Sequence, residues 1–246
     1  MMTFAGLGAA CLLNAQIAPP RAAALIERAL AVNKAQDEKG WKYTFREDSD
    51  QWQWGRNRER VAEHRKTYEH IMLEGSDYKK LILIDGQSLD AKTQKKVDAD
   101  LEKARAARRK HSDKSLFEYS GSLDLLARLF DNSVTGEETV LGRKTWRLES
   151  EPKRGYKAAN RREEQLLMLR ETIWFDQQDG AEIKERDVFL ETAKGFPPGT
   201  IVEMEFAKIG EAWLLDNLTF HLSFGGIHSR LYDYKRFTVD STLAPR

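Results

Sequence analysis

The sequence has little of several features that mark common protein classes. Of its 246 residues only Cys11 is a cysteine, so no disulfide can form within the chain. Its 40 basic and 39 acidic side chains nearly cancel, which argues against a dedicated nucleic-acid-binding protein. No apolar run reaches the roughly 18 residues that a membrane-spanning helix needs. The hydrophobic fraction of 41% is still enough for a core, so we expect a folded globular chain.

The motifs of common enzyme classes are also missing. There is no G-x-S-x-G nucleophile turn, no P-loop, no dinucleotide-binding glycine pattern and no H-E-x-x-H zinc motif. Carboxylates are so numerous that choosing two as an acid–base pair would be arbitrary. The sequence therefore predicts a non-enzymatic protein with no cofactor and no metal. An undetected hydrolase is the lesser alternative, and a deep polar pocket at His64 and His70 would be its first sign.

Two local patterns resemble metal sites, but neither has a complete set of ligands. His64 and His70 lie six residues apart on a predicted strand and should point to one side of it. Beside Glu63 or Glu69 they lack an identifiable third metal ligand, so we interpret both as polar residues on the solvated face of a strand. Residues 176–180 resemble the start of a calcium loop but lack its later ligands, and they predict a hairpin turn.

The first 18 residues differ from the rest of the chain. They carry no charge, are rich in alanine, glycine and leucine, and precede Pro19 and Pro20. This pattern predicts an export signal peptide, although the usual basic start is missing, so the start of translation has been placed too late or the segment is something else. A lipid anchor on Cys11 is the less favoured alternative, because the apolar run continues beyond it. Residues 19–246 are expected to form a single domain.

Helical patterns are few. An apolar stripe between Pro20 and Gly40 predicts a first helix, with proline and glycine at its ends. A second, strongly charged helix is expected over residues 88–110. A shorter third helix is expected over residues 116–130, where leucines recur at helical spacing.

Strand patterns fill most of the remainder. Alternation of aromatic and polar residues over 41–46 predicts a strand, with Trp52 and Trp54 on a second strand beyond a polar turn at 47–51. From Thr139 onward nearly all of the chain reads as strand and turn, with one of the turns at Gly225–Gly226. Further strands are expected at 56–74, 78–84, 146–148, 173–175, 188–190, 202–206, 213–215, 220–224 and 231–237, with a turn at Asp85–Gly86.

Strands at this close spacing connect as antiparallel hairpins. We therefore predict an α+β fold, in which about three helices cover the concave face of a strongly curved antiparallel sheet of roughly eight to ten strands.

One set of aromatic and aliphatic residues shares strand parity and should line the concave side. These residues can form an ordinary packed core beneath the helices, or a core left partly open that admits an acyl chain. A carrier of this kind needs only an apolar trough, because burying a palmitoyl-length chain contributes about 12 kcal/mol. The predicted lining residues are Tyr43, Phe45, Ile82, Ile84, Val202, Met204, Phe206, Phe220, Leu222 and Phe224.

Two basic blocks contain no acidic residue. The first runs from Lys103 to Lys110 and the second from Lys153 to Arg162. They can be solvated surface, or they can contact anionic lipid headgroups or an acidic partner surface. The residues expected to make such contacts are Arg105, Arg108, Arg109, Lys153, Arg154 and Lys157.

Several short segments resemble LolA-like bacterial envelope proteins, the outer-membrane lipoprotein-sorting group. They are residues 142–148, 151–157 and 173–176, the strand and turn at 78–87, and the ending 232–237. One departure is Ala158, where related sequences commonly have proline. The resemblance implies an unclosed antiparallel half-barrel in the periplasm, with helices over its concavity.

Such a protein would bind lipid or lipoprotein cargo, or other hydrophobic cargo, and we expect it to be a monomer with peripheral membrane contact at most. The alternative is an envelope protein-protein interaction or lipoprotein-sensing module.

Overall fold

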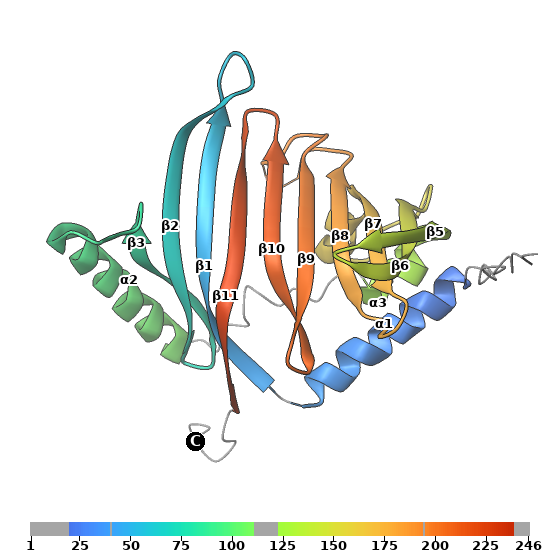
Figure 1. The fold of residues 1–246 in the computed structure, drawn as a ribbon, viewed down its shortest axis with the longest axis horizontal. Coiled ribbons are helices and arrows are strands. Elements are labelled where there is room, and N and C mark those ends of the chain that lie inside the picture. The colour runs from blue at the N-terminus through green and yellow to red at the C-terminus, as the bar shows by residue number, and fades with distance from the viewer. Residues whose placement is uncertain (1–19, 40, 111–122, 194, 239–246) are drawn as a thin grey trace, which may run out of the picture.

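The computed structural model describes residues 20–39, 41–110, 123–193 and 195–238 (Figure 1). The predicted signal peptide, Cys11 and part of the predicted third helix lie outside these ranges. The helices are α1 (Ala22–Asp37), α2 (Ala91–Lys110), α3 (Leu123–Leu129) and α4 (Arg161–Leu166). The strands are β1 (Trp41–Trp54), β2 (Arg60–Leu73), β3 (Ser76–Ile84), β4 (Gln87–Ser88), β5 (Phe130–Val140), β6 (Arg143–Pro152), β7 (Leu169–Asp176), β8 (Glu182–Phe189), β9 (Ile201–Ile209), β10 (Ala212–Leu222) and β11 (Gly225–Thr238).

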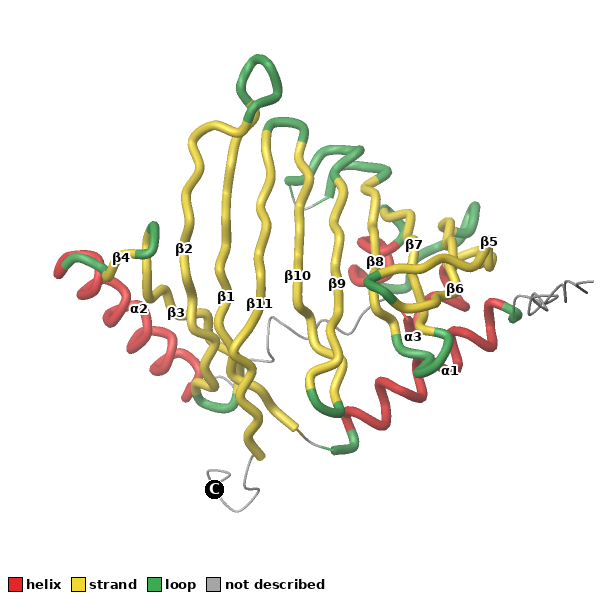
Figure 2. Tube along the Cα trace, viewed as in Figure 1, coloured by secondary structure: helices red, strands yellow, loops and turns green. Residues whose placement is uncertain are grey.

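In the described ranges these elements form an α+β fold around one antiparallel sheet of eleven strands. The strand order is β4-β3-β2-β1-β11-β10-β9-β8-β7-β6-β5, so the sheet has two free edges and does not close. The first long strand pairs with the last, because β1 lies between β2 and β11. Figure 2 shows the sheet curving from β2 and β11, which run upright in this view, to β5 and β6, which run across it. The predicted fold class is confirmed.

Residues 47–51 do not form the turn that their polarity predicts. They lie within the single strand β1, which continues to Trp52 and Trp54. Asp48 pairs in register with Thr67 on one side and with Arg230 on the other. The prediction of two strands here was wrong because polar residues on a strand between two partners look like a turn in the sequence.

Other boundaries also differ from the expected ones. Phe130 begins strand β5, which no pattern indicated, and the unpredicted helix α4 begins at Arg161, at the end of the second basic block. The β10–β11 turn lies at Ser223 and Phe224, two residues before the predicted glycine pair. The turn at Asp85–Gly86 is confirmed, and both residues have the positive φ angles, 51° and 74°, of a tight hairpin turn.

The helices divide between the two ends of the sheet. Helices α1 and α3 pack on each other and beside β5, whereas α2 lies beside β3 at the other end (Figure 1). Helix α2 buries none of its residues, so it contributes no core. The core therefore lies under α1 and α3, where Leu126, Leu148, Ile173 and Phe175 are completely buried.

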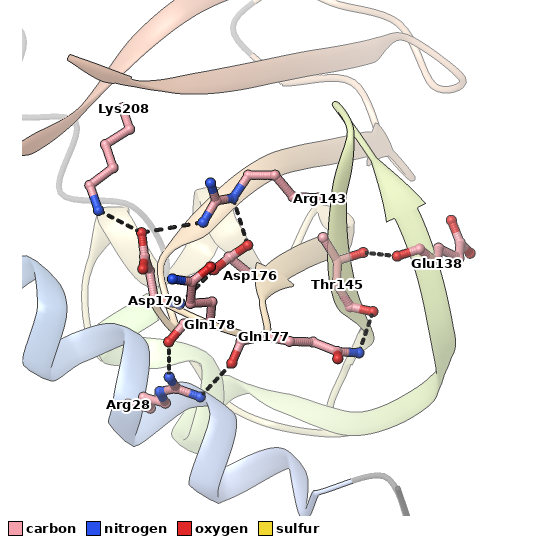
Figure 3. Close-up of polar contacts among 9 residues, drawn as sticks. All are labelled: Arg28, Glu138, Arg143, Thr145, Asp176, Gln177, Gln178, Asp179 and Lys208. Atoms are coloured by element: carbon pink, nitrogen blue, oxygen red, sulfur yellow. Dashed lines mark hydrogen bonds and ion pairs between the residues drawn. The ribbon is translucent and has the colours of Figure 1, made fainter. Parts of the chain in front are cut away.

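Polar contacts fix α1 over this end of the sheet. Arg28 donates a hydrogen bond of 3.0 Å to the backbone carbonyl of Gln177 and a second one to that of Gln178 (Figure 3). Both carbonyls belong to the β7–β8 turn, which confirms the predicted hairpin turn at 176–180. The turn carboxylates are occupied by cations: Arg143 contacts Asp176 at 2.7 Å, and Lys208 contacts Asp179 at 2.8 Å.

Candidate binding groove

A groove of about 850 Å³ lies on the concave face of the sheet. It extends over β1, β2, β3, β9, β10 and β11 and reaches Asp187 on β8. Among the described residues, no helix contributes to its lining. The strand register explains why the groove lies beside the core. Met204 on β9 pairs with Glu185 on β8, and Glu185 pairs in turn with Ile173 on β7. The groove and the packed core are therefore neighbouring parts of one face.

One wall of the groove is apolar. Leu214, Leu218 and Phe220 on β10 and Ile227 on β11 are only partly buried, although all are large apolar side chains. Phe220 stacks on Phe196 with the ring centroids 5.5 Å apart. Val202 and Met204 form the deeper floor, with 8% and 3% of their surfaces exposed.

Half of the residues predicted to line the concavity lie along this groove: Tyr43, Phe45, Val202, Met204 and Phe220. The other five do not line it: Ile82, Ile84, Phe206, Leu222 and Phe224. Phe224 lies in the β10–β11 turn with 61% of its surface exposed, and Leu222 is the last residue of β10. A register irregularity between Thr67 and Tyr68 interrupts the pairing of β3 with β2, and another between Leu215 and Asn217 interrupts that of β10 with β9. Such irregularities shift which side chains face the groove.

The opposite wall carries a buried charged cluster that the sequence reading missed. Glu47 Oε2 lies 2.9 Å from His70 Nε2, and Asp77 Oδ2 lies 3.1 Å from His70 Nδ1. Lys79 Nζ donates to Glu47 at 2.8 Å, and Ser229 Oγ donates to it at 2.7 Å. His70 has only 1% of its surface exposed, so its interpretation as a residue on a solvated face was wrong. His64 is exposed and lies in the same groove, on the same side of β2 as predicted.

The cluster shifts the pKa values of its members in opposite directions. Burial acts to raise the pKa of Glu47, but hydrogen bonds from His70, Lys79 and Ser229 outweigh it and lower the pKa to about 2. Burial acts to lower the pKa of His70, but its hydrogen bonds to Asp77 and Glu47 raise it above the ordinary value. A negative Glu47 and a positive His70 therefore stabilise each other. Both ring nitrogens of His70 are occupied by these carboxylates.

A second acidic group lies where the groove meets the packed core. Glu171 on β7 and Glu185 and Asp187 on β8 are 0%, 2% and 7% exposed. Burial, followed by repulsion from Glu185 and Glu171, raises the pKa of Asp187 well above its ordinary value. Burial and the same two neighbours also raise that of Glu182. One signal in the sequence marks this group: the carboxylates share strand parity with the core residues Ile173 and Ile183.

The first basic block mainly contacts the protein itself. Arg108 donates to the backbone carbonyls of Leu73, Ser76 and Asp77, which fixes α2 to the β2–β3 hairpin. Arg105 and Arg109 both pair with Glu74, at 3.8 Å and 3.0 Å.

The second block is divided. Lys153 donates to the carbonyls of Ala127 and Arg128 at the end of α3, whereas Arg154 and Lys157 are exposed. Arg154 and Lys157 are therefore, together with Arg109, the exposed members of the predicted set.

No protein-family model matches this chain, and no curated protein matches its sequence. Solved structures with a similar fold include a DUF1329 family protein from Desulfovibrio piger (12% identity, 92% of this chain and 96% of the other covered, TM-score 0.42). A second is an outer membrane lipoprotein-sorting protein domain from Vibrio parahaemolyticus (9% identity, 88% of this chain and 96% of the other covered, TM-score 0.40). A third is a LolA superfamily protein from Nitrosomonas europaea (9% identity, 93% of this chain and 99% of the other covered, TM-score 0.39). In the described ranges no helix is long and apolar enough to cross a membrane.

Proposed function

We propose that this protein binds the acyl chain of a lipid or lipoprotein in its concave groove, without covalent chemistry, in the periplasm. One observation carries the proposal: large apolar side chains line a groove that no described helix enters. Leu214, Leu218, Phe220 and Ile227 keep part of their apolar surface in contact with solvent. Covering that surface with a ligand is favourable by about 25 cal/mol for each Å² removed from water.

The size of the groove suits a lipid. Its volume of about 850 Å³ lies within the range of about 300–1,000 Å³ typical of small-molecule sites. A long unbranched chain can lie in a groove that extends over several strands, and each buried methylene contributes about 0.8 kcal/mol. Binding of this kind needs no reactive residue.

The polar wall supports an amphipathic ligand in preference to a pure hydrocarbon. Lys42 and Lys66, both exposed, line the groove together with His64, on the side opposite Leu218 and Phe220. Glu47 and Lys79 on the same wall already neutralise each other at 2.7 Å. An acyl chain on the apolar wall would therefore place its polar or anionic headgroup near Lys42 or Lys66.

Fluorescence titration with cis-parinaric acid, a fluorescent fatty acid, tests the proposal. We expect saturable enhancement with the wild-type protein, and at least about a tenfold weaker affinity after Leu218→Arg, because a buried charge displaces the chain. Leu190→Arg is the matched control, since Leu190 is 39% exposed and lies outside the groove lining.

Two results would overturn the proposal. The first is no enhancement with wild-type protein. The second is unchanged affinity in Leu218→Arg with a native circular dichroism spectrum.

A further inference from the structure

The buried acidic group at the edge of the groove has the arrangement of a cation site. Glu171 pairs in register with Asp187 across β7 and β8, and Glu185 lies two residues before Asp187 on the same face. One carboxylate oxygen from each of the three residues lies within 4.8 Å of the other two. All three side chains are at least nine-tenths buried.

The basic side chains of β8 point away from this group. Lys184 pairs with Glu205 at 3.0 Å, and Arg186 pairs with Glu203 at 3.6 Å. Because successive strand residues alternate between faces, these pairs lie on the opposite side of the sheet from Glu185 and Asp187. Strand β8 therefore supplies two of the three carboxylates but no basic side chain on the concave face.

A second observation is separate from the clustering. Oδ1 of Asp187 and Oε1 of Glu182 are buried, and neither has a hydrogen-bond partner in the described part of the protein. A buried carboxylate oxygen without a donor is unfavourable unless a cation or a proton satisfies it. Asp187 also lines the groove, so an ion and its water ligands can reach it from solvent.

We propose that Glu171, Glu185 and Asp187 bind a divalent cation, and that the cation is Ca²⁺. Carboxylate oxygens are hard ligands, which favour Ca²⁺ or Mg²⁺ over zinc or copper. Three carboxylates supplied by the protein favour Ca²⁺, which takes six to eight oxygen ligands in flexible geometry, over Mg²⁺, which keeps several waters and usually binds through one or two carboxylates. Water from the groove completes the coordination.

Calcium titration of the chelator-treated full-length protein tests this site. By isothermal calorimetry we expect saturable binding, with Tm rising by about 3–6 °C at about ten times the dissociation constant. In Asp187→Asn the calcium-induced rise should be lost.

Glu203→Gln is the matched control, since Glu203 is a carboxylate on the opposite face of the adjoining strand β9. It should keep the full response to calcium. The inference is overturned if millimolar calcium gives neither binding heat nor a rise in Tm with wild type, or if Asp187→Asn responds as wild type does. Fatty-acid binding is a separate measurement, so failure of this site leaves the proposed function intact.

Discussion

Two neighbouring regions of one concave face differ in how their apolar side chains are covered. Under α1 and α3, Leu148, Ile173 and Phe175 have no exposed surface. A few strands away Leu218, Phe220 and Ile227 remain partly exposed in the groove. Both sets arise from the same alternation of apolar and polar residues on antiparallel strands. The described helices make the difference, because α1 and α3 cover one region and no described helix lines the other.

Similar apolar residues therefore have different roles in the two regions. Side chains in the covered region stabilise the fold, since their apolar surface is fully removed from water. Side chains in the open region have surface left to bury, and a ligand can supply that burial. Mutations in the two regions should therefore separate stability from binding.

The largest expected effect follows from truncating a fully buried aromatic residue. Phe175→Ala should lower the free energy of unfolding by about 3–5 kcal/mol, because it leaves a cavity under α1 and α3. Leu218→Ala in the groove should lower it by less than about 1.5 kcal/mol, since part of that side chain is already solvated. Urea denaturation monitored by circular dichroism measures both.

In a fatty-acid-binding assay the order of the two effects should reverse. Leu218→Ala should weaken fatty-acid binding, while Phe175→Ala should retain it at temperatures where the variant is folded. Equal losses of stability in the two variants would show that the groove is packed as tightly as the core.

The next effect concerns pH and belongs to the open region alone. The pKa of Glu47 is about 2 in the folded protein against an ordinary 4.5, so its ionisation contributes about 3 kcal/mol above pH 4.5. This contribution is lost as the pH falls from 4.5 toward 2. The folded pKa of His70 is raised above 6.5, so the stability from its positive charge is complete below pH 6.5 and is lost as the pH rises through the folded value.

Comparing wild type with Glu47→Gln across pH isolates this contribution from other carboxylates. The difference in unfolding free energy should be largest between about pH 4.5 and 6.5 and should shrink toward pH 2. Asp77 and Lys79, which face the same pair, are unchanged in both proteins. Phe175→Ala serves as the control from the covered region, where the pH dependence of the difference should be flat. A constant difference for Glu47→Gln would contradict the shifted pKa.

The difference between the two regions also limits what the sequence could predict. Local patterns were sufficient for α1, whose stripe is bounded by Pro20 and Gly40, and for the alternating strand β9, whereas the predicted strand segments at 213–215 and 220–224 belong largely to one strand, β10. Val202, Met204 and Phe220 share strand parity and lie along the groove. Local patterns carry no information on which helix covers which strand, so they could not separate the packed core from the open groove.

Contacts between distant residues account for the remaining errors. His70 is buried because Glu47, 23 residues earlier, and Asp77 satisfy both ring nitrogens. Its own strand is polar, so its neighbours suggest exposure to solvent. Asp48 and Asp50 look like turn residues for the same reason, since their partners Thr67 and Arg65 lie on another strand. In the sequence, the carboxylates at 171, 185 and 187 alternate in step with the core residues of their strands. Only the register of β7 and β8 shows that they lie together.

The smallest effect tests how α1 closes the covered region. Gly180 and Gly142 both lie in hairpin turns with φ of 76°, so alanine at either position should cost about 1–2 kcal/mol. Only at Gly180 would the new Cβ also meet another side chain, that of Arg28, with atoms 2.5–2.7 Å away. Gly180→Ala should therefore be the more destabilising by a further ~0.5–1 kcal/mol, because the two hydrogen bonds from Arg28 to the turn are displaced. In an Arg28→Ala background that excess should vanish, leaving Gly180→Ala and Gly142→Ala equal in thermal unfolding. An excess that persisted without Arg28 would mean that the turn itself, and not its contact with α1, resists the substitution.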